Sequence, residues 1–462
     1  VLERRARLWQ ELRQLIGATA EETETAAREI QIRVERIWES VNQRRTANAA
    51  EETSTTKGTG PHWAANWWQA IADELAQPPR RWSDEPLVVR EQEDYHVLRS
   101  SVSPEVATTI DSHPERFPGV KTRVRTRRVY SQRDLAAHLL GVRTPRREEE
   151  VQDSETQRVG EAMGRSGLER QYDHLLHGHP GRLRRIVDRH GEVLTTEVVE
   201  PARHGQDLVL TLDLALQQHA EQLLDAALDG ESRAGEDASP ESIPDGTAPP
   251  GGCLVAIDVH TGALLAAAAA PRFDANLLVS ADPQAWNQLA ADPRKPFYPR
   301  LTHMALPPGS VFKAVTAVAL LQGGGVHPEE TVSCIGYLDS PTQHRCLIYR
   351  HYGFGHGDTN LFDALCRSCN VYFFANARRA GPQPLVEWAR RLGIGAPTGI
   401  DLPSEAAGTL PAPGDRNSSQ RRWYAGDTLG LAIGQSSLTT TPLQIARMMA
   451  AIANGGSLVT PH

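Results

Sequence analysis

Apolar residues recur at helical spacing through the first 45 residues of the chain, in a background rich in Glu, Arg and Ala. The apolar positions are Leu8, Leu12, Leu15, Ile16, Ile30, Ile32, Val34 and Ile37. A repeat of three to four residues is typical of amphipathic helices, so the pattern predicts two helices here. From Thr46 to His62 the chain has no aromatic or branched aliphatic residue, and we expect a loop or a disordered stretch.

The pattern then changes to short alternating runs. The segments GVKTRVRTRRVY and HGEVLTTEVVEP are rich in branched residues and predict strands. At DLVLTLDLALQQHAEQLLDAAL a strand over 207–211 is followed by a helix that Asp213 can cap. One face of this helix is predicted to carry Leu216, Ala220, Leu223 and Ala227. A second domain is therefore expected to begin near residue 206, which gives two domains, 1–205 and 206–462.

The second domain opens with a polar, Pro- and Gly-rich stretch, 229–250, which we expect to be an exposed insertion. GGCLVAIDVHTGALLAAAAAP predicts two buried strands, 252–258 and 263–270, joined by a turn at His260, Thr261 and Gly262. Helices are predicted over 310–321, 361–380, 383–392 and 442–453. Thr441, Pro442 and Asn454-Gly455-Gly456 are typical start and stop signals for the last of these. The fold class is α+β.

Composition narrows the classes of function. The 462 residues are 40% hydrophobic and 23% charged, which is typical of a soluble globular protein. The net charge of −8 comes without a long block of one sign, which argues against nucleic acid as a partner. No apolar run reaches the roughly 18 residues of a membrane span, and the first residues do not have the pattern of a signal peptide.

The stretch PPGSVFKAVTAVALL places Ser310 and Lys313 three residues apart at the start of a predicted helix, so both lie on one face. A serine hydroxyl becomes a good nucleophile only when a base removes its proton. Burial among apolar neighbours lowers the pKa of a lysine, which would leave the amine of Lys313 neutral and able to accept that proton. Gly309 allows the backbone to approach a substrate closely. Because S-x-x-K also occurs by chance, the pair alone does not establish a catalytic site.

A second element follows in SCNVYFFANARRAG, where Ser368 and Asn370 precede an apolar helical run. A second hydroxyl can relay protons between a lysine and a leaving group, and an asparagine amide can orient both the lysine and a peptide substrate. The alternative is that Ser368 caps a helix and Asn370 bonds to backbone. The presence of both elements in one chain favours a catalytic site.

Together these motifs resemble the class B penicillin-binding proteins, most closely the elongation-type group called penicillin-binding protein 2. The S-x-x-K, S-x-N and K-[ST]-G set belongs to this superfamily, which includes the serine β-lactamases. The resemblance extends from about residue 90 to the last residue. Its other segments are FPGVKTRVRTRRVY, AAHLLG, GRSGLERQYDHLLHGHPG, GIDLPSEAAG and WYAGDTLGLAIGQSSLTTTPLQIARMMAAIANGG.

The resemblance implies a transpeptidase domain, 206–462, preceded by an extended pedestal domain, 1–205. It implies a D,D-transpeptidase that cross-links peptidoglycan stem peptides and is acylated by β-lactams. Ser310 would be the nucleophile and Lys313 its base, Ser368 would pass a proton to the leaving amine, and Asn370 would hold the donor peptide. The resemblance also suggests Gly309 and Trp423 as substrate-binding residues, and it implies that no cofactor is required.

The resemblance further implies where the protein works and with what. We expect the bacterial inner membrane, with a single anchor upstream of this chain and a periplasmic catalytic domain. Expected partners are a SEDS-type glycosyltransferase and other elongation-complex proteins. The sequence departs from the family in one respect, because no K-[ST]-G follows residue 370. In relatives that strand supplies part of the oxyanion hole, so the site within these residues is expected to be incomplete.

Two other functions remain open. The chain could act as a non-catalytic scaffold or a β-lactam-sensing module that binds cell-wall proteins through residues 1–205. It could also be a β-lactamase, although no deacylating base such as the Glu of class A enzymes is evident and the large N-terminal module argues against it.

The five cysteines are Cys253, Cys334, Cys346, Cys366 and Cys369. Zinc could bind among Cys334, Cys346, His351, His356, Cys366 and Cys369, but C-x11-C is not a standard zinc-knuckle spacing. A Cys334–Cys346 disulfide or free thiols are favoured over a metal, and all three alternatives stay open. Cys369, inside the S-x-N element, is predicted to be a packing residue.

Overall fold

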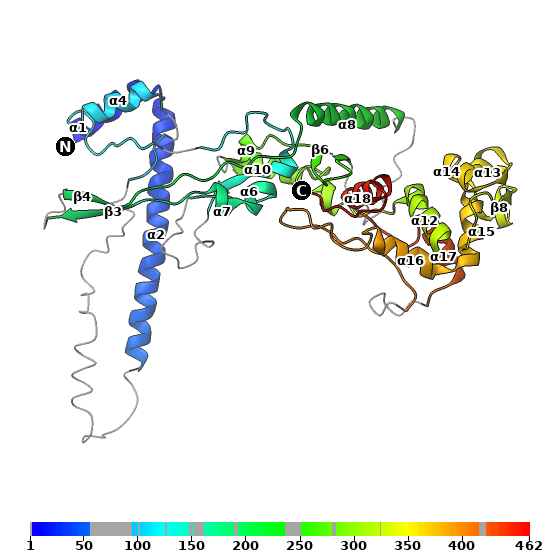
Figure 1. Cartoon of the computed structure of the whole chain (residues 1–462). Coiled ribbons are helices and arrows are strands. Elements are labelled where there is room, and N and C mark those ends of the chain that lie inside the picture. The colour runs from blue at the N-terminus through cyan, green and yellow to red at the C-terminus, as the bar shows by residue number, and fades with distance from the viewer. Residues whose placement is uncertain are drawn as a thin grey trace, which may run out of the picture. The chain divides into compact units, whose positions relative to one another are not determined.

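The computed structural model describes residues 2–55, 95–99, 102–124, 127–146, 150, 161–188, 193–235, 251–279, 283–323, 325–414 and 422–462. They fall into two compact units, Val1–Thr126 and Arg127–His462 (Figure 1). This division does not test the predicted domain boundary at residues 205 and 206, which stays a prediction. No described helix is both long enough and apolar enough to cross a membrane.

The first unit is helical. Its helices are α1 (Leu2–Ile16), α2 (Ala20–Thr55) and α4 (Pro104–Ser112). Leu12 of α1 packs with Ile110 of α4 and with Phe117 to form a small core. The two predicted helices are confirmed. The loop expected from Thr46 is wrong as far as Thr55, where α2 ends, because alanine and glutamate propagate a helix without needing an apolar face. Residues 56–62 lie outside the described part of the chain.

Strands in the described part of the second unit pair two by two and antiparallel, as β1–β2, β3–β4, β5–β6, β7–β10 and β8–β9. Their bounds are β1 (Arg143–Pro145), β2 (Ala162–Gly164), β3 (Arg182–Val187), β4 (Val193–Glu200), β5 (Gly252–Ile257), β6 (Leu264–Ala270), β7 (Val332–Cys334), β8 (Tyr337–Ser340), β9 (Gln343–Arg345) and β10 (Gly357–Thr359).

The helices of this unit are mostly in its second half. They are α5 (Ala137–Leu140), α6 (Gly167–Gln171), α7 (Asp173–Leu176), α8 (Leu214–Gly235), α9 (Asn276–Val279), α10 (Pro283–Ala291), α11 (Arg300–His303), the 3₁₀ helix η3 (Gly309–Phe312), α12 (Lys313–Gly323), α13 (Leu347–Tyr352), α14 (Leu361–Cys366), α15 (Asn370–Ala380), α16 (Pro382–Arg391), α17 (Ala425–Ala432) and α18 (Pro442–Ala453).

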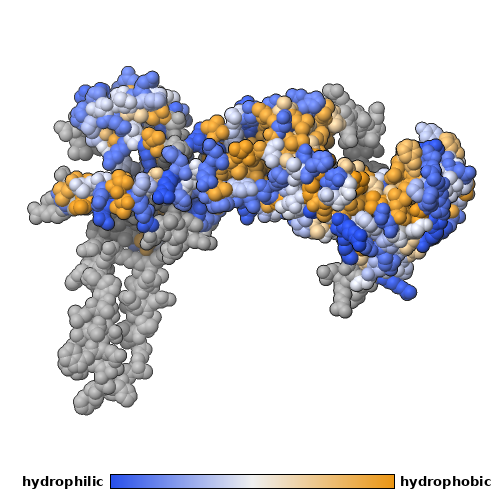
Figure 2. Space-filling view, in the orientation of Figure 1, coloured by the Kyte–Doolittle hydropathy of each residue, from blue (hydrophilic) through white to orange (hydrophobic). Residues whose placement is uncertain are grey.

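The β3–β4 ribbon is exposed, and every residue of β4 is accessible to solvent. Figure 2 shows hydrophobic patches along it, which include Leu183 and Leu194. The strand predicted within HGEVLTTEVVEP is confirmed as β4. The strand predicted within GVKTRVRTRRVY is wrong for the described residues of that segment, which belong to no ladder. The predicted strand over 207–211 is wrong for the same reason, although Leu208 and Leu210 pack on the core.

Helix α8 packs against the sheet formed by β5 and β6. Both strands occur as predicted, with register pairs such as Leu254 with Ala268. The alanines of β6 allow α8 to lie close to the sheet, and Ala266 and Ala268 are fully buried beside Ala220 of the helix. The Asp213 side chain accepts a hydrogen bond from Leu216 N–H at 2.8 Å, which confirms the predicted cap.

The four residues predicted to share one face of α8 do so by their spacing, but of the four only Ala220 is buried. Leu223 is 51% exposed, whereas Gln217 and Glu221 are buried. Polar groups occupy the inner face because they bond to the sheet and to a neighbouring segment. The Gln217 amide accepts from Ala267 N–H at 2.7 Å, and Glu221 accepts from Ala136 N–H at 2.8 Å. The expected insertion at 229–250 begins later than predicted, because α8 continues to Gly235, and residues 236–250 lie outside the described ones.

Helix α12 lies in the centre of the helical part. Phe312 and Val315 belong to one apolar cluster, with residues of α16, α17 and α18, while Ala317 and Leu320 belong to a second cluster with α15. A helix that is apolar on all sides is a buried core helix. The segment that begins at Ser310 is therefore fixed from several directions.

The predicted helices need two corrections. The helix expected over 310–321 starts as the 3₁₀ turn η3, and its α-helical part begins at Lys313. The helix expected over 361–380 is two helices, α14 and α15, separated by a break at Ser368. The helix over 442–453 is confirmed as α18, and Thr441 accepts from Gln444 N–H at 3.3 Å as its cap.

Candidate active site and metal centre

Ser310 lies in η3 and is exposed, directly before the buried start of α12. Its position depends on two glycines. Gly309 has a positive φ of 59°, and its N–H donates to the carbonyl oxygen of Gly434 at 2.9 Å. A methyl group on Gly434 would lie 2.1 Å from the Gly309 carbonyl oxygen, so the two backbones meet where only glycine fits.

This contact gives a first prediction. Gly434→Ala should lower the free energy of unfolding by about 1–3 kcal/mol more than Gly455→Ala, because the added methyl group would overpack the contact. Gly455 is a matched control, since its φ of 87° is also positive but nothing lies within 4 Å of a methyl group there. Urea unfolding measures both values. Equal losses would show that the Gly309–Gly434 contact does not constrain the loop.

Lys313 is buried and lies below Ser310. Its side chain is 2% exposed, and its Nζ lies 5.7 Å from the centre of the Phe373 ring. Burial lowers the pKa of Lys313 to about 8, and the nearby sulfurs of Cys346 and Cys369 oppose part of that shift. A useful fraction of neutral amine is therefore present near neutral pH.

The S-x-N element reaches Lys313 from the other side. Lys313 Nζ donates to Ser368 Oγ at 2.9 Å, to the Ser368 carbonyl oxygen at 2.8 Å and to Asn370 Oδ1 at 2.6 Å. Ser368 Oγ in turn donates to Ser310 Oγ at 3.0 Å. Ser368 has a left-handed φ of 53°, an uncommon conformation for serine, and it lies between α14 and α15.

The four residues predicted to be catalytic therefore lie together in one hydrogen-bonded chain. The expected direct contact between Ser310 and Lys313 is replaced by a path through the Ser368 hydroxyl. Such a chain can carry a proton from the exposed Ser310 hydroxyl to the buried amine, and back toward a leaving group. The geometry permits acyl transfer by a serine nucleophile.

Trp423 packs against the first apolar cluster, and its indole N–H donates to Thr428 Oγ1 at 2.9 Å. Its substrate-binding role stays a prediction, as does that of Gly309.

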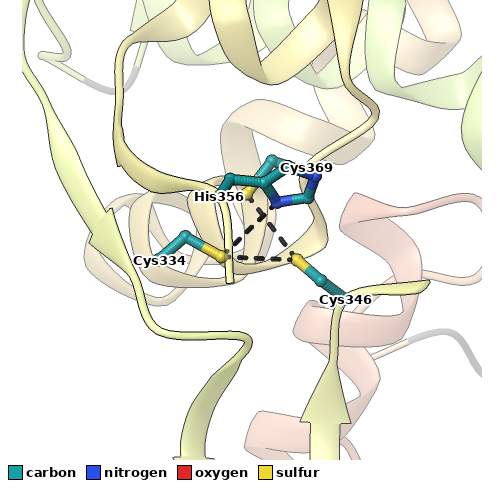
Figure 3. A group of neighbouring side chains, drawn as sticks. All are labelled: Cys334, Cys346, His356 and Cys369. Atoms are coloured by element: carbon teal, nitrogen blue, oxygen red, sulfur yellow. Dashed lines mark hydrogen bonds between the residues drawn. The ribbon is translucent and has the colours of Figure 1, made fainter. Parts of the chain in front are cut away.

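A second group of side chains lies directly behind the S-x-N element. Cys334, Cys346, His356 and Cys369 each direct one ligand atom to a common centre, and these atoms all lie within 4.8 Å of one another (Figure 3). The sulfur of Cys346 lies 3.6 Å from that of Cys334 and 3.7 Å from that of Cys369. His356 Nδ1 lies 3.5 Å from the Cys334 sulfur.

These distances fit a tetrahedral zinc site. Zinc bonds of about 2.3 Å to sulfur and about 2.0 Å to nitrogen place two sulfurs about 3.8 Å apart, and a sulfur and a nitrogen about 3.5 Å apart. The three sulfurs are almost completely buried, so solvent does not compete for the ligand atoms. All five cysteines are free thiols, and 3.6 Å between Cys334 and Cys346 is far too long for a disulfide bond.

One sequence interpretation of these residues is wrong, because Cys366 and His351 are exposed and do not belong to the cluster. Cys369 lies in a buried apolar cluster, as predicted for a packing residue, and its sulfur also belongs to the group that could hold a metal. The approach of the β7–β10 and β8–β9 hairpins to α15 is a tertiary feature that the spacing of the cysteines does not reveal.

Two family models match the chain. The penicillin-binding protein dimerisation domain matches residues 6–210, and the penicillin-binding protein transpeptidase domain matches residues 252–462. The chain belongs to the penicillin-binding proteins. The fold class predicted from the sequence is thereby confirmed.

Relatives of this penicillin-binding protein include peptidoglycan D,D-transpeptidases named MrdA. The one from Acinetobacter baumannii is 33% identical over 352 residues, which is 75% of this chain and 49% of the relative. The one from Escherichia coli is 31% identical over 364 residues, 75% of this chain and 52% of the relative. The chain thus spans about half the length of these curated relatives.

Solved structures of penicillin-binding proteins are also similar to this chain. The Helicobacter pylori complex between penicillin-binding protein PBP2 and MreC matches with a TM-score of 0.66 at 27% identity, over 78% of this chain and 63% of that one. A structure titled for the coordination of polymerization and crosslinking by a peptidoglycan synthase complex matches with a TM-score of 0.64 at 32% identity, over 77% and 60% of the two chains. Pseudomonas aeruginosa PBP2 in complex with WCK 5153 has a TM-score of 0.60 at 29% identity, over 74% and 67%.

Proposed function

We propose that this penicillin-binding protein is a peptidoglycan D,D-transpeptidase that works through a serine acyl-enzyme. The observation that carries the proposal is the hydrogen-bonded chain Ser310–Ser368–Lys313 with Asn370 at its end. Four groups of the kinds needed for acyl transfer meet around one exposed hydroxyl, and the amine among them has a lowered pKa. The named activity of the MrdA relatives supports the same reaction.

The reaction follows from the positions of these groups. Ser310 Oγ attacks the carbonyl of the penultimate D-alanine of a donor stem peptide while its proton passes through Ser368 Oγ to neutral Lys313. The proton returns to the amine of the terminal D-alanine, which leaves, and the rest of the peptide stays as an ester on Ser310. An amine of a second stem peptide then attacks the ester and forms the cross-link. A β-lactam replaces the donor, and ring opening leaves the same serine acylated.

A transpeptidation assay tests the proposal in the full-length protein. A donor peptide that ends in D-Ala-D-Ala and an acceptor amine should give free D-alanine and an amide product, and benzylpenicillin should block both. Absence of D-alanine release together with stable binding of penicillin would favour a sensing module. Rapid hydrolysis of the antibiotic would favour a β-lactamase.

We propose further that the protein serves cell-wall elongation from the inner membrane, with an anchor outside this chain and a periplasmic catalytic domain. The solved complexes with MreC and of a peptidoglycan synthase support partners from an elongation complex, including a SEDS-type glycosyltransferase that would make the glycan strands. Co-purification of the tagged full-length protein with such a polymerase tests this proposal.

We also propose that Cys334, Cys346, His356 and Cys369 hold a zinc ion. Four protein ligands leave no open position, so the metal would stabilise the fold and would not activate water. It would cross-link β7, the residue that follows β9, the loop before β10 and the residue that caps α15. No cofactor is needed for the acyl transfer itself.

Removal of this metal gives a second prediction. Purified protein should contain about one zinc per chain by mass spectrometry of the metal, and Cys334→Ser should lose it. The free energy of unfolding should fall by about 3 kcal/mol, on the scale of a buried ion pair that loses one partner. This decrease should lower the melting temperature by about 6–12 °C. Cys366→Ser is the matched control and should keep the zinc, because Cys366 is exposed and outside the cluster. Wild-type protein that binds no zinc when it is supplied would contradict the assignment.

A further inference from the structure

Arg345 ends β9, and Cys346 follows it. These two residues contact the segment 369–371, which ends the S-x-N element and begins α15. The carbonyl oxygen of Arg345 accepts a hydrogen bond from Asn370 Nδ2 at 3.0 Å. The sulfur of Cys346 lies 3.7 Å from that of Cys369 and accepts a hydrogen bond from Val371 N–H at 3.4 Å. Main chain, side chain and sulfur of the turn are therefore all held from one short segment.

The turn needs such a support. Ser368 is held in a left-handed conformation, which costs on the order of 1–3 kcal/mol and persists only where neighbouring contacts enforce it. Within the same turn, Ser368 Oγ and Asn370 Oδ1 must both face Lys313 Nζ, at 2.9 and 2.6 Å. Relaxation of the turn would move both groups, because they are only two residues apart.

The hydrogen bond to Val371 also explains why the support comes from Cys346. Val371 is in the first turn of α15, where N–H groups have no partner within the helix. The sulfur of Cys346, which is completely buried, takes one of these N–H groups and fixes the helix start from which Asn370 projects. An N–H bond to a ligand sulfur is compatible with metal binding and orients the ligand.

We infer that Cys346 is a positioning residue for the proposed acyl transfer, in addition to any role as a metal ligand. Through Val371 and Cys369, and through the preceding Arg345 carbonyl, it holds Ser368 and Asn370 at the distances that Lys313 requires. The inference rests on the proposed function and adds a residue that touches neither the substrate nor the nucleophile.

Cys334 is the matched control for metal loss. Its sulfur is also buried and also belongs to the cluster, where it faces Cys346 and His356. Within the described residues it has no hydrogen bond to the main chain of the turn. Cys334→Ala and Cys346→Ala should therefore lose zinc equally, while only Cys346→Ala removes the acceptor of the Val371 N–H.

The test is the kinetics of acylation of the full-length protein by a fluorescent penicillin. The first-order acylation rate constant of Cys346→Ala should be at least about tenfold below that of Cys334→Ala, because misplacement by about 1 Å costs up to about 100-fold. The antibiotic concentration that gives half of the maximal acylation rate should be the same in the two variants. A general loss of stability would not lower the rate constant and leave this concentration unchanged. Equal rate constants in the two variants would overturn the inference. A wild-type protein that is not labelled at all would instead refute the proposed function.

A second measurement covers the case that Cys346→Ala does not fold. Hydrogen exchange of a peptide that spans residues 369–373 is followed in wild-type protein with and without a zinc chelator. The Val371 amide should remain protected when zinc is removed, because its partner is the sulfur and not the metal. Loss of that protection would assign the support of the turn to the metal alone and overturn the inference.

Discussion

Ser310→Ala is expected to abolish covalent capture of β-lactams completely. The Ser310 hydroxyl is the exposed end of the chain that leads to Lys313, and Ser368 Oγ lies 3.0 Å from it. The acylated fraction measured with a fluorescent penicillin should therefore fall from nearly all of the protein to background.

A matched variant distinguishes this loss from general damage. Ser340→Ala removes a partly buried serine of the β8–β9 hairpin, whose Oγ bonds only to Thr342 and its N–H among the described contacts. It should be labelled like wild-type protein. Mass spectrometry of the labelled peptide should find the adduct on Ser310. An adduct on any other residue, or labelling that survives in Ser310→Ala, would refute the assignment of the nucleophile.

The candidate catalytic residues could be predicted from the sequence because their spacing is local. Ser310 and Lys313 are three residues apart, and Ser368 and Asn370 two residues apart, so each pair shares a face or a turn whatever the rest of the chain does. The connection between the pairs could not be predicted in the same way. The bond from Ser368 Oγ to Ser310 Oγ joins residues 58 positions apart, and it requires the left-handed Ser368 that divides the expected helix into α14 and α15.

The same distinction explains the errors in the fold. Strands β5 and β6 were predictable, since their apolar residues pair with each other across one short turn. The segments near residues 120–130 and 207–211 have strand-like composition but no partner in a described ladder, and composition alone does not supply one. The inner face of α8 is polar because Gln217 and Glu221 bond to backbone groups from elements that are distant in sequence.

Cysteine spacing failed for a related reason. A zinc knuckle is recognised when its ligands lie on one turn. Here the ligands come from a strand, two helix caps and a loop, namely Cys334 of β7, Cys346 before α13, Cys369 before α15 and His356 before β10. The cluster lies behind the catalytic turn, so that one residue, Cys369, is flanked by both catalytic side chains of S-x-N. Stability and catalysis therefore share the same few residues, and variants of the cluster need the acylation rate constant as well as the melting temperature.

The loss of Lys313 should have the next largest effect. Lys313→Met is expected to lower the acylation rate constant by about 10²–10⁴, the usual contribution of a general base. Lys313→Arg should be no better, because a guanidinium keeps the charge but does not give up its proton near neutral pH. In wild-type protein the rate should rise with pH, since the neutral amine is the active form and burial lowers its pKa to about 8. At pH 7 about one tenth of the amine is neutral, so the rate should increase by up to about tenfold between pH 7 and pH 9.5. Stopped-flow acylation over that pH range, with an antibiotic that does not itself titrate there, measures the profile. A rate that does not change with pH, or a Lys313→Arg variant with wild-type kinetics, would show that Lys313 acts only as a fixed positive charge.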